Sequence, residues 1–183
     1  MNSDMVPYNR TFGSSEAGRV LGIPGATIRS WEGRRLIHTD PALSGHHRHL
    51  WAIDVFYIGL LREFLAGGFS ADNAMATAAA VIYGDRETDV RRELRSPTSD
   101  RVRACQQDYA HVATDVRHRD ESSPFWVVYS VGESLPGAVL PWQEACNRAL
   151  TLRHAGCINL TRLLAGIDRD LSRLSAQRKG RAE

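Results

Sequence analysis

The chain has 183 residues, enough for one ordinary domain or for a small module followed by a second domain of about 100 residues. Its 43% hydrophobic and 24% charged residues are typical of a soluble globular protein and exclude a wholly disordered chain or a fibrous repeat. The net charge of +2 does not itself indicate a nucleic-acid partner. Lys179 is the only lysine among many arginines, a bias that fits either contacts to guanine and phosphate or simply codon usage.

Location and redox state follow from what the chain lacks. It has no run of eighteen apolar residues, and residues 1–10 lack the basic-then-apolar pattern of an export signal. We therefore expect a cytoplasmic protein without membrane contact. Cys105, Cys146 and Cys157 are odd in number and widely spaced, so we expect reduced, buried thiols rather than disulfides or a metal site.

The first elements form two short helices. Residues 1–10 are expected to be a loose arm, and a helix is expected to begin at Ser14, with the serine as its cap, and to end at Gly22. A turn over residues 23–25 leads into a second helix over residues 26–37. This is the outline of a helix-turn-helix, in which the second helix enters the major groove of DNA.

Residues 38–50 are polar and irregular, and we expect them to form a two-stranded wing. His46, His47 and His49 fit three roles: phosphate donors, a metal cluster, or plain polar residues of the wing. The metal role is the weakest because neighbouring positions on a strand point to opposite faces.

Further helices follow the wing. An apolar helix is expected to open at residues 53–55 and to stop at residues 67–68, with a capped helix starting at Ser70. The domain boundary is expected at a linker over residues 76–98. The C-terminal domain is expected over residues 99–177. It should contain a helix at residues 100–119, a buried strand at 125–131, and helices at 142–153 and 159–177. A basic tail over residues 178–183 follows.

Residues 27–37 resemble the signature of the MerR family of transcription regulators. The family carries Thr, an aliphatic residue, Arg, an aromatic residue and Glu before a short exit containing leucine, which here reads Thr27-Ile28-Arg29-Ser30-Trp31-Glu32 and then Leu36-Ile37. The likeness continues in register through residues 11–75, with Arg48 in the place of the wing arginine and Asp54 at the acidic start of the third helix. It implies a winged helix-turn-helix, so the expected fold is mainly α with a small β component: this module plus a small α+β C-terminal domain.

The resemblance and the chemistry of the side chains give a set of expected DNA contacts. An arginine and hydroxyl groups on the first turns of a recognition helix can reach bases and phosphates, and the wing arginine would bind the DNA backbone. Trp31 fits a phosphate contact and core packing equally well. The expected DNA-binding residues are Gly25, Ala26, Thr27, Arg29, Ser30, Trp31, Arg34, His47 and Arg48.

The chain departs from the family at two places. Where the family has an aromatic residue on each side of the wing arginine, this chain has His47 and Leu50, and residues 76–98 lack the heptads of the family's long dimerisation helix. A different apolar row has the three-and-four spacing of a short coiled coil, and it serves either as a dimer seam or as an amphipathic helix that covers its own domain. The residues of this row are Leu160, Leu164, Ile167, Leu171 and Leu174.

These patterns predict a sequence-specific regulator that binds double-stranded DNA as a homodimer on an inverted repeat, with RNA polymerase as a further candidate partner. The alternatives are an architectural or excision-type DNA-binding protein, and a protein-interaction module that has lost its DNA affinity. Phe125, Trp126, Tyr129 and Trp142 could line a small-molecule pocket, but an aromatic strand face is more often core. The chain has no motif of catalysis, so neither an enzyme nor a cofactor is expected.

Overall fold

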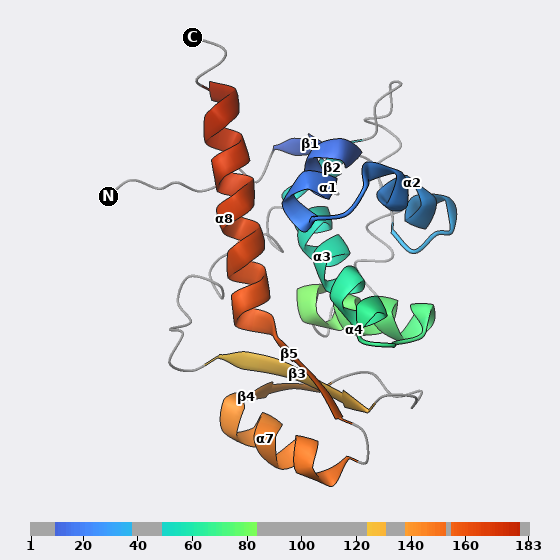
Figure 1. Cartoon of the computed structure of the whole chain (residues 1–183), viewed down its shortest axis with the longest axis vertical. Helices are drawn as coiled ribbons and strands as arrows, with labels where there is room; N and C mark the ends of the chain where they lie inside the picture. Colours follow the sequence, from blue (N-terminus) through green and yellow to red (C-terminus); the bar gives the residue numbers. More distant parts are fainter. Residues whose placement is uncertain (1–9, 38–48, 84–123, 131–137, 153–154, 180–183) are drawn as a thin grey trace.

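A computed structural model describes the chain over residues 10–37, 49–83, 124–130, 138–152 and 155–179. The described part is mainly helical and contains two small antiparallel sheets, which agrees with the predicted mainly α fold with a small β component. Figure 1 shows the long helix α8 (Leu160–Lys179) lying alongside the helices of the N-terminal half, with the larger sheet at the start of α8.

Helix α1 (Ser14–Leu21) follows the short strand β1 (Thr11–Gly13). Its cap is Gly13 rather than Ser14, because the Glu16 carboxylate accepts the backbone N–H of Gly13 at 3.0 Å. The helix ends as predicted at Gly22, which has the left-handed φ of 65° that glycine tolerates. After a three-residue turn, helix α2 (Gly25–Gly33) begins.

Strand β2 (His49–Trp51) pairs with β1 in antiparallel register, with Phe12 opposite Leu50. Strand β1 was not predicted. It lies before α1, directly after residues 1–10, which were expected to be a loose arm. Phe12 and Leu50 are both buried, so the pair closes over the core that α1 covers. Residues 38–48, the rest of the expected wing, lie outside the described residues.

Helices α3 (Ala52–Ala66) and α4 (Ala71–Tyr83) complete the N-terminal half. Asp54 caps the start of α3 by accepting the backbone N–H of Trp51 at 2.8 Å, and Ser70 accepts the N–H of Asn73 at 3.3 Å at the start of α4. Both starts agree with the predictions. Helix α4 continues to Tyr83 and so occupies the first part of the segment expected to be a linker.

The larger sheet has the strand order β4-β3-β5, with both neighbours antiparallel to the central strand. Strand β3 (Phe125–Ser130) and helix α7 (Trp142–Thr151) were predicted, whereas β4 (Ala138–Pro141) and β5 (Ala155–Asn159) were not. Helix α7 covers the face of the sheet that points away from the N-terminal helices (Figure 1). The helix expected over residues 100–119 lies outside the described residues.

Helix α8 is packed against the N-terminal half of the same chain. It contacts α3, α1 and β3, and the Thr161 hydroxyl accepts the N–H of Phe125 at 3.0 Å at the edge of the sheet. One hydrophobic cluster therefore joins residues of α1, α2, α3 and α4 with residues of β3 and α8. The expected DNA-binding module and the described part of the expected C-terminal domain share a core.

Candidate nucleic-acid interface

One face of α2 is exposed and consists of small side chains around a single arginine. Ala26, Arg29, Ser30 and Gly33 are all exposed, and their spacing of three and four residues places them on one side of the helix. Ile28 is fully buried on the opposite side. Because three of the four residues are small, the backbone of α2 can come close to another molecule, with Arg29 as the long side chain that projects from this face.

Two glycines hold α2 tightly against α1. A Cβ on Gly18 would lie 2.5 Å from the carbonyl oxygen of Ile23 and 3.1 Å from the nitrogen of Gly25. A Cβ on Gly25 would lie 3.2 Å from the carbonyl oxygen of Ser14. A side chain has no room at Gly18 and would crowd the backbone of α1 at Gly25, so close backbone contact sets how the two helices pack. Gly25 therefore positions α2, whatever it contacts besides.

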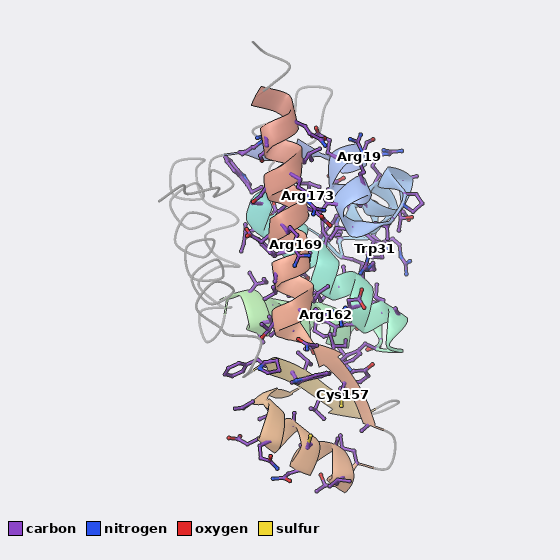
Figure 2. All side chains as sticks on the ribbon, turned by 60° about the vertical axis from the view of Figure 1, so that its left-hand side comes forward. Arg19, Trp31, Cys157, Arg162, Arg169 and Arg173 are labelled. Carbon is purple, nitrogen blue, oxygen red and sulfur yellow. The ribbon has the colours of Figure 1, made fainter. Side chains whose placement is uncertain are left out.

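Trp31 and Thr27 are half-buried, unlike the residues of the exposed face. The Trp31 side chain packs against the hydrophobic core. Of the two roles predicted for Trp31, core packing is therefore the one for which the structure shows a contact. Part of the ring stays exposed, and Figure 2 shows Trp31 on the same side of the molecule as Arg19 of α1.

The end of α2 adds exposed arginines. Arg34 and Arg35 follow the helix and are both exposed, and Arg35 has a left-handed φ of 60°, which is uncommon for a residue with a side chain. The next two residues, Leu36 and Ile37, are buried, and the Tyr57 hydroxyl donates to the carbonyl oxygen of Leu36 at 3.3 Å. This anchor keeps the two arginines on the surface. Arg35 was not predicted as a site residue. Its position between Arg34 and the apolar pair Leu36-Ile37 is the sequence feature that could have indicated it.

The guanidinium groups of Arg29, Arg34 and Arg35 have no ion pair with any residue in the described part of the chain. Arg19, near the end of α1, is likewise exposed and without a charged partner there. Such arginines remain available to a ligand with negative charge, since no ion pair among the described residues has to be broken first.

The remaining predicted site residues divide into two groups. His46, His47 and Arg48 lie outside the described residues, as does the side chain of His49. The predicted dimer residues are buried inside this single chain, on the face of α8 that packs against α3 and α1. This face thus packs mainly on helices of the N-terminal half, rather than only on its own domain as the second predicted role had it, and the dimer prediction has no assigned surface.

The cysteines differ from the expectation. Cys146 is half-buried and Cys157 is exposed, and both are free thiols. Partial burial and the neighbouring Cys146 raise the pKa of the Cys157 thiol, so it carries less thiolate at neutral pH than an ordinary cysteine. Cys105 lies outside the described residues. Within the described ranges, no group of His, Cys, Asp and Glu is arranged to hold a metal ion.

Of the aromatic residues on strand β3, Tyr129 is part of the core, whereas Phe125 and Trp126 are half-buried. Tyr129 packs its ring on Phe69, with 4.2 Å between the ring centroids, and only 8% of Tyr129 is exposed. Burial is also the main reason why the pKa of Tyr129 is raised above its ordinary value. The side chain of Trp142 lies outside the description. Tyr129 thus joins the sheet to the residues that follow α3.

A search against models of protein families finds no match to this chain, and a search of curated proteins finds no significant relative. None of the described helices is both long enough and apolar enough to cross a membrane.

Proposed function

We propose that this protein is a transcription regulator that binds double-stranded DNA through a winged helix-turn-helix, with α2 as the recognition helix. The observation that carries the proposal is the exposed face of α2, where Arg29 stands among Ala26, Ser30 and Gly33. A recognition helix needs a backbone that can approach the groove and one or two long donors that reach base edges. Arg29 supplies the donors, because a guanidinium can bond to both O6 and N7 of guanine.

The neighbouring elements support this role. Helix α1 is fixed against α2 across a three-residue turn, the arrangement in which a first helix crosses the DNA backbone. Arg34 and Arg35 lie at the end of α2, where they would bind phosphates on either side of the groove. The resemblance of Thr27 to Glu32 to the MerR signature supports the same assignment, and by that resemblance His47 and Arg48 belong to the wing.

The proposal includes a two-fold mode of action. Regulators with this kind of module read inverted repeats as symmetric dimers, so we propose a homodimer on an inverted-repeat operator, with RNA polymerase as a candidate partner at the promoter. The dimer surface is to be sought outside the apolar face of α8, because that face is buried in each chain.

Selection of bound duplexes from a random DNA library tests the proposal. The full-length protein should enrich a short motif arranged as an inverted repeat. Enrichment of one motif without a repeat would support DNA reading and contradict the two-fold model. If no motif is enriched but random duplex is bound in a salt-dependent manner, the protein is an architectural DNA binder. Failure to bind any duplex would remove α2 as a recognition helix.

A further inference from the structure

Helix α8 carries a row of arginines on the side that faces away from the core. Arg162, Arg169 and Arg173 are exposed and lie seven and four residues apart, so they share one face of the helix. Figure 2 shows the three side chains along the length of α8, with Arg19 of α1 beside its upper half. By the rise of an α-helix, the row from Arg162 to Arg173 spans about 16 Å.

Negative charge does little to neutralise this row. Asp170 forms one ion pair with Arg173, at 3.5 Å, and both side chains are largely open to solvent, so the pair contributes little. Arg162 and Arg169 have no ion pair with any described residue. The row therefore presents at least two positive charges on α8 that no described residue pairs with.

Gly166 lies on the same face, between Arg162 and Arg169. Nothing lies within 4 Å of the position where its Cβ would be, so no contact inside the described chain requires a glycine there. A glycine within a helix lowers its stability relative to alanine. Its presence on this face fits a surface that another molecule approaches closely.

The row is connected to the proposed recognition helix through α1. Helix α1 contacts both α2 and α8, and its exposed Arg19 lies between the exposed part of α2 and the arginines of α8 in Figure 2. A partner bound along α2 that carries a long line of negative charge would continue across Arg19 to Arg169 and Arg173. The DNA backbone is such a partner, with one phosphate for every 1.7 Å or so of duplex length.

We infer that the arginine face of α8, defined by Arg162, Arg169 and Arg173, is a second DNA contact that binds the sugar-phosphate backbone beside the groove occupied by α2. This inference rests on the proposed function, since it requires that the protein binds duplex DNA. Contacts to phosphate position a protein without reading sequence. The arginine face thus strengthens binding to every duplex and leaves the choice of operator to α2.

The test replaces the three arginines by glutamine, which removes the charge and keeps a similar helix propensity. Affinity for a random-sequence duplex a few helical turns long is measured at several salt concentrations. The slope of log affinity against log salt should fall by about 2 to 3 units in the triple variant, and by about 1 unit in Arg169→Gln alone. The control is Arg148→Gln, because Arg148 is exposed on α7, on the far side of the sheet.

The outcomes separate this inference from the proposed function. If wild type binds duplex and the triple variant, still folded by circular dichroism, keeps the wild-type slope, the inference is overturned and the role of α2 stands. In that case an acidic protein surface becomes the better candidate for the arginine face. If wild type binds no duplex at any salt concentration, both fail. If Arg148→Gln lowers the slope as much as Arg169→Gln does, the inference is also overturned, because the effect would then depend only on total charge.

Discussion

Gly59 of α3 lies directly against Ile167 of α8: a Cβ at Gly59 would overlap the Cδ1 atom of Ile167 and would lie 3.1 Å from Leu21 of α1. Three helices therefore meet at one glycine. Arg62, one turn further along α3, donates to the carbonyl oxygen of Leu21 at the end of α1. The position of the first helix of the proposed DNA-binding unit thus depends on α3, and through Gly59 on the C-terminal helix.

The first prediction concerns this contact. Both Gly59→Ala and Gly166→Ala gain helix propensity, but Gly59→Ala should be less stable than Gly166→Ala by about 1 to 3 kcal/mol, because the added methyl group forces Ile167 out of its position. Gly166→Ala is the matched control, since its methyl group meets nothing, and it should raise stability by about 0.5 to 1 kcal/mol. Urea denaturation measures both. Equal stabilisation by the two substitutions would mean that α8 does not pack on α3.

The second prediction distinguishes a core helix from a dimer seam. Leu171 is fully buried in the single chain, so Leu171→Ala should cost about 2 to 5 kcal/mol at every protein concentration. Sedimentation equilibrium should give the same mass for variant and wild type. A variant that converts a dimer into stable monomers, with a loss that grows on dilution, would instead place Leu171 between subunits.

Tyr129 supplies a prediction about pH. Burial raises the pKa of its phenol, so the folded state holds this proton more tightly than the unfolded state does. The stability linked to this proton is complete below the ordinary tyrosine pKa and is lost as the pH rises through the raised value. In Tyr129→Phe, which keeps the ring on Phe69, the free energy of unfolding should fall less steeply over that range. An unchanged pH profile would show that the phenol is not buried.

Much of the N-terminal half could be predicted because its signals are local. Ser70 caps α4 and Gly22 ends α1 as predicted, and Asp54 lies at the start of α3 where an acidic residue was expected, since each depends on atoms within a few residues. Gly13 replaced Ser14 as the cap of α1 because Glu16 reaches back to it. This interaction is also local, but the sequence Gly13-Ser14-Ser15 does not by itself show which residue is the cap.

The parts that could not be predicted depend on distant partners. Strand β5 contains glycine, cysteine and asparagine without alternation, and it is a strand because it pairs along β3. The apolar spacing on α8 is the same for a dimer seam and for a helix packed on its own chain, and only the presence of α3 decides between them. The exposed face of α2 could be listed by residue type, but its exposure follows from how Gly18 and Gly25 fix the helix.

The most direct test of the central claim compares Arg29→Ala with Arg148→Ala in binding to the selected operator and to random duplex. Arg29 is exposed on α2 and Arg148 on α7, so both variants lose the same charge and neither loses core packing. We predict that Arg29→Ala reduces the preference for operator over random duplex by about 1 to 3 kcal/mol, roughly 5- to 150-fold, while Arg148→Ala retains it. An undiminished preference in folded Arg29→Ala protein would contradict the assignment of α2 as the recognition helix.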